Sequence, residues 1–331
     1  MKRRSVLALG CFYPAFAFSR VKFPEVEPGR ALRFPRDHGA HPDYRQEWWY
    51  VTGWLKTARG EDLGFQITFF RARPDIETEN PSSFAPRQIL LAHAALSDPK
   101  LGRLKHDERA ARAALGLAGS KEGNTEVWVD DWKLLLGPEG YSARIRAREF
   151  ELDLNFSAAP VVLQGRNGFS RKGSKASEAS YYYSRPQLKV SGSADGRPVT
   201  GLAWLDHEWS SQYMDSGAEG WDWCGLNLDD GSALMAFRMR AKGGGVAFEP
   251  EGVSFEPLRT WKSPRTGAVY PVSMRINGQL RLEPLMDDQE LDARSSTGTI
   301  YWEGAVTAYR GDAAVGRGYL ELTGYWRPMK L

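Results

Sequence analysis

The sequence predicts an all-β protein with two antiparallel β-barrels in tandem. Three observations carry this prediction: apolar and polar residues alternate with period two over short stretches, aromatic and β-branched residues are enriched there, and Gly, Asp and Asn recur between the stretches. With 331 residues, 42% of them hydrophobic, the chain suits one large domain or two of about 150 residues. A disordered chain, a collagen-like fibre and a disulfide scaffold are excluded.

Twelve segments show the strand pattern, which is too many for one small barrel. In chain order they are Glu47–Leu55, Leu63–Ala72, Gln88–Ser97, Glu126–Leu136, Arg144–Phe156, Gln187–Ser193, Thr200–Trp209, Trp221–Leu228, Ala233–Arg240, Met274–Leu282, Tyr301–Tyr309 and Gly318–Tyr325. Hairpin turns are predicted at Asp195-Gly196, at Asp229-Asp230-Gly231 and at Asn277-Gly278.

One short helix is predicted at His106–Leu115, because acidic residues begin this segment and Gly116 ends it. The Gly-, Ser- and Lys-rich stretch Asn167–Ser180 predicts an exposed loop. A joint near Ser210–Gly220 divides the strands into two barrels, which we place at residues 18–212 and 213–331.

Residues 1–17 have the pattern of a secretory signal peptide. Lys2, Arg3 and Arg4 precede a short apolar run, and Ala15-Phe16-Ala17 matches a cleavage site. The paired arginines also resemble a twin-arginine signal, which would export a folded chain. Lipid anchoring at Cys11 and an uncleaved cytoplasmic start are the alternatives. We therefore expect a periplasmic or secreted protein that does not span the membrane, because the apolar run is too short to cross a bilayer.

Cleavage of this leader removes three basic residues and no acidic residue, so the formal charge falls from +3 to zero. We therefore expect no nucleic-acid partner. Only Cys224 then remains of the two cysteines, so no intramolecular disulfide can form. Cys224 lies in an aromatic stretch, which favours a buried small side chain over a catalytic thiol.

Three motifs gather six of the twelve tryptophans around acidic residues and a histidine. They span residues 41–53, 201–210 and 220–231. Strand alternation sorts their side chains by face: Trp204, Asp206 and Glu208 oppose Leu205, His207 and Trp209; Trp221 and Trp223 oppose Asp222 and Cys224; Glu47 and Trp49 oppose Trp48 and Tyr50.

A carboxylate among tryptophans is costly unless it is paired, protonated or functional. One interpretation is a ligand cavity in which burial keeps an acid protonated, so that it can protonate an alkene while tryptophan faces stabilise positive charge. The other is a structural cluster in which Asp206, His207 and Glu208 join the two barrels through arginine or backbone partners. The residues alone leave both interpretations open.

Other candidate sites are weaker. The turn His38-Gly39-Ala40-His41 has ligand-type residues, but we expect no metal centre there, and His93 is expected to be a hydrogen-bonded strand histidine. The common serine-hydrolase, metalloprotease, nucleotide-binding and dinucleotide-binding motifs are absent from the sequence, and we expect no cofactor.

The chain resembles the lipocalin-like superfamily that includes AttH-type secreted proteins and the carotenoid 1,2-hydratases, also called hydroxyneurosporene synthases. The resemblance covers roughly residues 33–326. It rests on Phe34-Pro35-Arg36-Asp37-His38-Gly39 with His41-Pro42, Glu47-Trp48-Trp49-Tyr50, Gly64-Phe65-Gln66-Ile67-Thr68-Phe69-Phe70-Arg71, Trp204-Leu205-Asp206-His207-Glu208-Trp209 and Gly220-Trp221-Asp222-Trp223.

This resemblance implies two calycin-type barrels and a hydrophobic small-molecule ligand. In the hydratases a histidine and the tryptophan two positions later belong to the proposed site, and here they fall on His207 and Trp209. The hydratases also use an acidic proton donor, for which Asp206 and Asp222 are the candidates. The remaining candidate ligand-binding residues are Glu47, Trp48, Trp49, Glu208, Tyr213, Trp221 and Trp223.

Two functions follow as hypotheses. The first is a periplasmic protein that binds a lipid or isoprenoid-like molecule and assists an ABC-type membrane transporter, as AttH-type relatives suggest. The second is a cofactor-free hydratase or cyclase in which a buried Asp protonates an alkene and His207 positions the acid or water. A cavity reached by a buried carboxyl would favour the enzyme, and an apolar cavity without titratable groups would favour carriage.

Overall fold

The computed structural model describes residues 21–75, 85, 87–214 and 217–329. The leader predicted at residues 1–17, with Cys11, lies outside the described residues. Nearly all regular structure is β, as predicted, and the helical elements of the described residues are two 3-10 turns, η1 (Arg36–His38) and η2 (Pro99–Leu101). No helix in the described part of the chain is long and apolar enough to cross a membrane.

The first sheet is antiparallel and has the order β4-β3-β2-β1-β13-β12-β9-β8-β7-β6-β5, with β10 and β11 paired to β12. Its strands are β1 (Gln46–Thr57), β2 (Asp62–Ala72), β3 (Ile89–Ser97), β4 (Leu104–Arg112), β5 (Ala118–Ser120), β6 (Glu126–Val129), β7 (Trp132–Gly137), β8 (Gly140–Arg146), β9 (Glu151–Ser157), β10 (Val162–Leu163), β11 (Phe169–Arg171), β12 (Ala179–Ala194) and β13 (Arg197–Gln212).

The second sheet is also antiparallel and has the order β16-β15-β14-β22-β21-β19-β18-β17, with β20 paired to β21. Its strands are β14 (Ala218–Leu228), β15 (Ala233–Ala241), β16 (Val246–Phe248), β17 (Phe255–Lys262), β18 (Val269–Ile276), β19 (Leu280–Pro284), β20 (Glu290–Ala293), β21 (Thr299–Arg310) and β22 (Ala313–Leu322).

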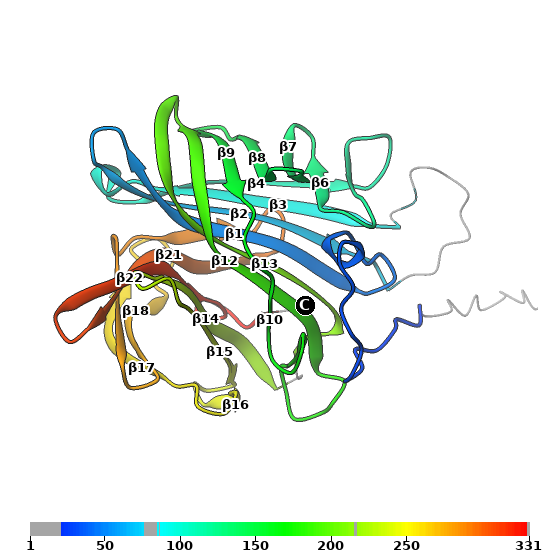
Figure 1. The fold of residues 1–331 in the computed structure, drawn as a ribbon. Helices are drawn as coiled ribbons and strands as arrows, with labels where there is room; N and C mark the ends of the chain where they lie inside the picture. The colour runs from blue at the N-terminus through cyan, green and yellow to red at the C-terminus, as the bar shows by residue number, and fades with distance from the viewer. Residues whose placement is uncertain (1–20, 76–84, 86, 215–216, 330–331) are drawn as a thin grey trace, which may run out of the picture.

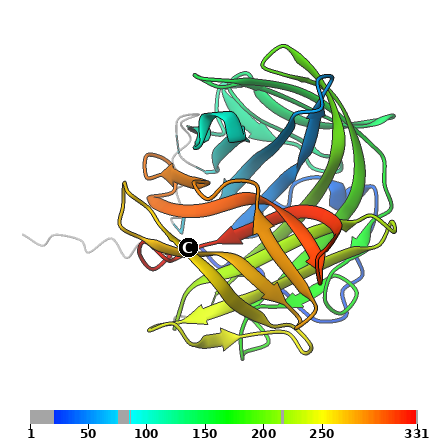
Figure 2. The same cartoon turned by 90° about the vertical axis from the view of Figure 1, so that its left-hand side faces the viewer.

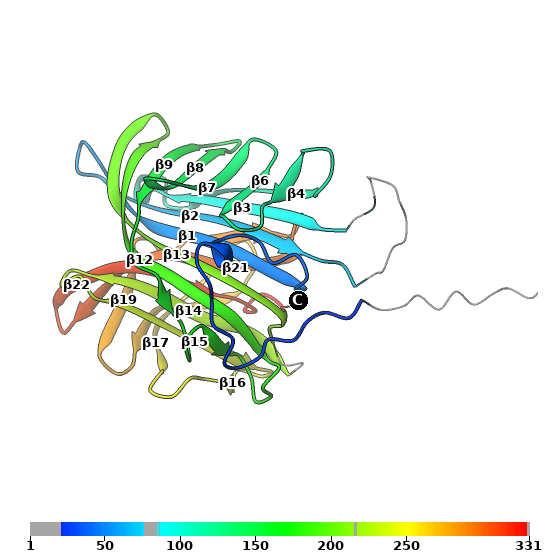
Figure 3. The same cartoon turned by 45° about the vertical axis from the view of Figure 1, so that its right-hand side comes forward.

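Each sheet curls around its own hydrophobic core, as expected for tandem calycin-type barrels (Figures 1 and 2). Figure 1 shows most of the first sheet, blue to green, above the second, yellow-green to red. The segment before β1 lies beside β12, where the Glu27 backbone N–H donates to the Tyr181 hydroxyl at 2.9 Å (Figure 3).

The two sheets meet along their outer faces, and we call this contact the seam. A third hydrophobic cluster, rich in aromatic rings, fills the seam. Tyr50 and Trp204 from the first sheet pack there against Trp223 and Tyr319 from the second. Strands β1 and β13 pair with each other and are buried on both faces, so their sequences carry large side chains at consecutive positions. This double burial explains why tryptophans and acids alternate in the motifs of these strands.

The predicted hairpin turns are confirmed. Asp195-Gly196 joins β12 to β13 with φ values of 50° and 67°, and Asn277-Gly278 joins β18 to β19 with 52° and 67°. Both residues of each turn occupy the left-handed region, which suits Asn, Asp and Gly. Asp229-Asp230-Gly231 lies between β14 and β15.

Two local predictions are wrong. His106–Leu115 is not a helix, because Leu104–Arg112 forms strand β4 and pairs with β3 over nine residues. The long ladder outweighs the weak helical signal of a few acidic residues. Asn167–Ser180 is not wholly an exposed loop: Phe169–Arg171 forms β11 against β12, and Lys172 and Glu178 are buried. Lys172 has an ionic partner inside the seam, which the local composition could not show.

Candidate active site

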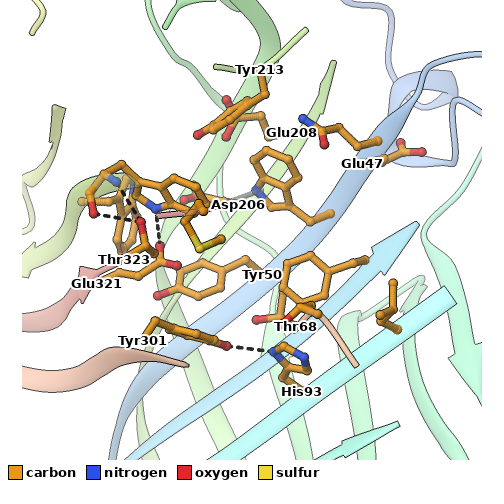
Figure 4. A pocket seen from close by; sticks show the side chains of 18 of the residues that line it. Glu47, Tyr50, Thr68, His93, Asp206, Glu208, Tyr213, Tyr301, Glu321 and Thr323 are labelled. Carbon is orange, nitrogen blue, oxygen red and sulfur yellow. Dashed lines mark hydrogen bonds between the residues drawn. The ribbon is translucent and has the colours of Figure 1, made fainter. Parts of the chain in front are cut away.

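A cavity of about 290 Å³ lies in the seam between the two sheets. The first sheet supplies one wall from β1, β2, β3, β12 and β13, and the second supplies the other from β14, β21 and β22 (Figure 4). Large aromatic rings form much of the wall, but Asp206, Glu208, Glu303 and Glu321 all border it. The cavity therefore combines an apolar surface with five acidic side chains, because Glu47 also borders it.

Asp206 projects from β13 into this cavity and accepts hydrogen bonds from neutral donors. The Trp204 indole donates to Oδ1 at 2.7 Å, and the Tyr182 hydroxyl donates to Oδ2 at 2.6 Å. Trp223 in turn donates its indole N–H to the Tyr182 oxygen at 3.1 Å, which orients the Tyr182 proton toward Asp206. Burial raises the pKa of Asp206 to about 7, although these hydrogen bonds act in the opposite direction.

Glu208 lies two residues further on the same face of β13, and it has a cationic partner. The Lys172 ammonium is 2.8 Å from Glu208 Oε1, and the Ser180 hydroxyl also donates to this carboxylate. Lys172 lies 3.9 Å from the centre of the Phe237 ring and close to two further rings, and these contacts favour an ammonium ion, whereas burial lowers the pKa of Lys172. Burial raises the pKa of Glu208, and the lysine charge opposes this rise. Glu208 therefore has a cationic partner, whereas the hydrogen-bond partners of Asp206 are neutral.

Glu303 and Glu321 face each other directly across β21 and β22. The Trp221 indole donates to Glu321 Oε2 at 3.1 Å, whereas Glu303 Oε1 has no hydrogen-bond partner in the described part of the chain. Burial raises the pKa of Glu321 to about 7 and that of Glu303 well above its usual value, the latter further raised by the Glu321 charge. Two carboxyls in one apolar site favour retention of a proton between them.

Aromatic rings and one histidine complete the cavity wall. Tyr213 packs edge-on against Trp48 and Trp221, with ring centroids 4.8 and 5.7 Å apart. On the opposite side, His93 Nδ1 lies 2.8 Å from the Tyr301 hydroxyl (Figure 4) and its Nε2 lies 2.8 Å from the Ser296 hydroxyl. His93 is therefore a hydrogen-bonded strand histidine, as predicted. Burial lowers the pKa of His93 to about 3, so its ring is neutral.

His207 faces away from this cavity, into the interior of the first sheet. Its Nε2 lies 2.8 Å from Glu47 Oε1 and its Nδ1 lies 3.2 Å from the Tyr183 hydroxyl, which also contacts His38 at 3.0 Å. Arg185 donates to the other nitrogen of His38. Each group can then donate to the next, from Arg185 through His38, Tyr183 and His207 to Glu47. Burial lowers the pKa of His207. A neutral His207 thus donates to Glu47.

Glu47 is the centre of this interior cluster. It borders the cavity, but its carboxylate accepts from His41 Nδ1 and from Arg71 Nε, each at 2.8 Å. Burial alone would raise the pKa of Glu47, but the positive charges of Arg71 and His41 hold it well below its usual value. The Trp49 ring stacks on His207 and the Trp209 ring stacks on His41, with centroids 4.7 and 3.7 Å apart.

His41, Glu47 and His207 bring three ligand-type atoms within 4.8 Å of one another. His41 holds Glu47 through one nitrogen and Asp37 through the other at 3.1 Å, an arrangement that requires a proton on each nitrogen. Glu47 raises the pKa of His41 above its ordinary value, although burial acts in the opposite direction. A metal ion there would compete with these protons and with Arg71, so the residues present do not fit a metal centre.

Asp222 lies on the face of β14 opposite Trp221 and Trp223, inside the second sheet. Arg238 Nε donates to its Oδ2 at 2.8 Å, and the Tyr325 hydroxyl donates to its Oδ1 at 2.9 Å. Burial raises the pKa of Asp222 against the opposing charges of Arg240 and Arg238. Cys224 is buried on the same face, and burial raises its pKa to about 12, as expected for a structural thiol.

A family model described as AttH-like matches residues 25–325 of this sequence. The chain belongs to the AttH-like family. The solved structure of an AttH protein from Nitrosomonas europaea has 52% sequence identity and a TM-score of 0.84, and the alignment covers 92% of this AttH-like chain and 100% of the other. Kievitone hydratase from Nectria haematococca has the same fold, with a TM-score of 0.61, 15% identity, and coverage of 93% and 98%. No match was found among curated proteins.

The predicted site residues of this AttH-like protein therefore separate into three places. Six of them border the cavity: Trp48, Asp206, Glu208, Tyr213, Trp221 and Trp223. Trp49, His207 and Trp209 lie in the interior of the first sheet, and Glu47 borders the cavity but is hydrogen-bonded in that interior. Asp222 lies in the interior of the second sheet. Sequence reasoning missed Glu303 and Glu321. Each is an acid inside an apolar strand, the signal that drew attention to Asp206, and the same signal could have found them.

Proposed function

We propose that the seam cavity binds an apolar small molecule and adds water to one of its carbon–carbon double bonds without a cofactor. The observation that carries this proposal is the contrast between two acids on one strand face. Asp206 has neutral partners and titrates near pH 7, whereas Glu208 is paired with Lys172. Two acids with different environments at one aromatic cavity suit a general acid and a general base.

In the proposed reaction, protonated Asp206 gives its proton to one alkene carbon, and the electron pair of the double bond forms the new C–H bond. The neighbouring carbon becomes positive, and the faces of Trp221 and Trp223 stabilise this charge. Water then forms the C–O bond and loses a proton to the Glu208 carboxylate. Side chains two positions apart on a strand stand about 7 Å apart, which leaves room for an alkene carbon and a water molecule between them.

Kievitone hydratase shares this fold, and its name states a hydratase activity for that protein. The shared fold supports the choice of hydration over the other acid-catalysed reactions of alkenes, while the argument itself depends on the acids of this cavity. Trp221 and Trp223 reach the cavity with a carboxyl beside them, which is the arrangement that favours an enzyme over a carrier.

Replacement of Asp206 by Asn tests the proposal. Linear isoprenoid alkenes and prenylated phenols are incubated with the protein in ¹⁸O-labelled water, and mass spectrometry detects addition of one labelled water. We expect Asp206→Asn to lower the rate by at least about a hundredfold, because Asn offers no acidic proton. The rate of the unchanged protein should fall as pH rises through about 7, since only protonated Asp206 donates.

Asp312→Asn is the matched control, because Asp312 is exposed in the turn between β21 and β22. Equal rates for Asp206→Asn and the control would refute Asp206 as the acid. Tight binding of these compounds with no labelled product would support the second candidate, a carrier, which the large aromatic share of the cavity wall favours.

We also propose that the protein works in the periplasm or outside the cell and that an ABC-type transporter is its partner. The support is the leader pattern of residues 1–17 and the AttH-like family membership. Cell fractionation, with cross-linking of the exported protein to membrane proteins, tests both points. Recovery of the full-length chain in the cytoplasm would contradict them.

A further inference from the structure

The acids of the second-sheet wall suggest what kind of ligand the cavity takes. Glu303 and Glu321 are opposite each other on β21 and β22, and both are buried at the cavity. The Glu303 carboxyl and the Tyr50 hydroxyl interact with each other, but Glu303 Oε1 and the Tyr50 oxygen lack a hydrogen bond of normal geometry among the described residues. Unpaired buried polar atoms are costly, so a group that binds there would recover this cost.

The cations near the cavity are already engaged. Lys172 is paired with Glu208, and Arg71 divides its nitrogens among Glu47, Gln88 and backbone oxygens. His93 is held neutral between two hydroxyl groups. The described cavity wall therefore offers no free cation to Glu303 and Glu321, and one negative charge shared by this pair would have no counter-charge.

We propose that the ligand of this cavity is an apolar molecule with one protonated amine, which is seated between Glu303 and Glu321. The Tyr50 and Tyr301 rings border this part of the cavity (Figure 4), and the Trp221 indole donates to Glu321. Aromatic faces together with carboxylates are the usual surroundings of a bound ammonium group. The inference rests on the proposed function, since it assumes that the cavity is a binding site. Beyond the proposed function, the inference specifies that the apolar ligand carries one positive charge.

Calorimetric titration with three eight-carbon probes tests the proposal: octylamine, 1-octanol and octanoate. At pH 8 we expect octylamine to bind at least about tenfold more tightly than 1-octanol, and octanoate to bind most weakly. At pH 5 this preference should shrink, because protonation removes the negative charge of the acid pair while the amine stays charged. This pH comparison uses the unchanged protein and needs no variant.

Glu303→Gln and Glu321→Gln should each abolish the preference for the amine at pH 8 while leaving the affinity for 1-octanol within about twofold. Glu139→Gln is the matched control, since Glu139 is exposed in the turn between β7 and β8 and should leave the preference unchanged.

Equal binding of octylamine and 1-octanol by the unchanged protein would overturn this inference and leave the proposed function standing. Persistence of the preference in both Gln variants would overturn it as well. Failure of all three probes to bind would refute the binding site itself, and both proposals with it.

Discussion

Neighbouring residues of β13 have separate roles because successive side chains point to opposite faces. Asp206 and Glu208 face the seam cavity, while His207 between them is bound to Glu47 inside the first sheet. The histidine that the family resemblance connects with catalysis is therefore fully enclosed by protein groups here. We assign His207 a structural role, because it donates a hydrogen bond to the buried carboxylate of Glu47.

Replacement of His207 by Ala should lower the free energy of unfolding by about 3 kcal/mol, since it removes a donor from buried Glu47 and leaves a void beside Trp49. Urea unfolding measures this loss. His106→Ala is the control, because His106 is only half-buried and contacts a backbone oxygen. If the His207→Ala protein is as stable as the unchanged protein but no longer acts on its substrate, His207 has a catalytic role instead.

Alternation along the strands was enough to sort these side chains by face from the sequence. It could not show which face borders a cavity, because both faces of β1 and β13 are buried. The other charged groups of the cavity come from other segments of the chain. Lys172 follows β11 and meets Glu208 within the first sheet, and Glu303 faces Glu321 within the second. Only the packing of the two sheets brings both pairs to one cavity, and no local pattern encodes that packing.

At the scale of the element, β2 shows how closely the two sheets approach. A methyl group added at Gly64 would lie 2.6 Å from the Ala305 side chain on β21 and 2.8 Å from the Tyr319 hydroxyl on β22. Both distances are far below normal van der Waals contact. A glycine at this position therefore permits β2 to pack against the second sheet.

Gly64→Ala should destabilise the protein by about 1–3 kcal/mol, because the added methyl group forces the two sheets apart. Gly137→Ala is the matched control, since its added methyl group would meet only one atom, at 3.8 Å, and should change stability by no more than about 0.5 kcal/mol. Thermal or urea unfolding compares the two. Equal stability of both variants would contradict the close packing at Gly64.

Element types were predictable where the strand pattern or the turn chemistry was strong, as at Asp195-Gly196 and Asn277-Gly278. The error at Leu104–Arg112 has a physical cause. Acidic residues there resemble a helix start, yet Asp107 is held by Arg148, whose Nε lies 2.9 Å from Asp107 Oδ1. A long-range ion pair and a nine-residue ladder decided the structure of a segment whose local preference is weak.

For the whole molecule, several buried or half-buried polar contacts join the two sheets. The Trp54 indole donates to the Gly318 carbonyl at 2.9 Å, and Ser97 donates to Gln289 at 2.8 Å. Arg317 holds Asp62 through two hydrogen bonds of 2.9 and 3.0 Å. Together with the aromatic cluster of the seam, these contacts make the stability of each sheet depend on the other.

We therefore expect a single unfolding transition in urea, with coincident midpoints by tryptophan fluorescence and far-ultraviolet circular dichroism. The physical reason is that unfolding of one sheet would expose the aromatic seam of the other. Two separated transitions would contradict this coupling and would show that the sheets unfold independently.

The seam cavity has a consequence for how this protein can change over time. Its walls come from both sheets, so a bound molecule would become part of the interface that holds them together, and ligand concentration would add to stability by mass action. Substitutions far from the ligand that shift the spacing of the sheets would alter affinity as well. Selection for a new ligand and selection for a durable fold would thus act on the same set of residues.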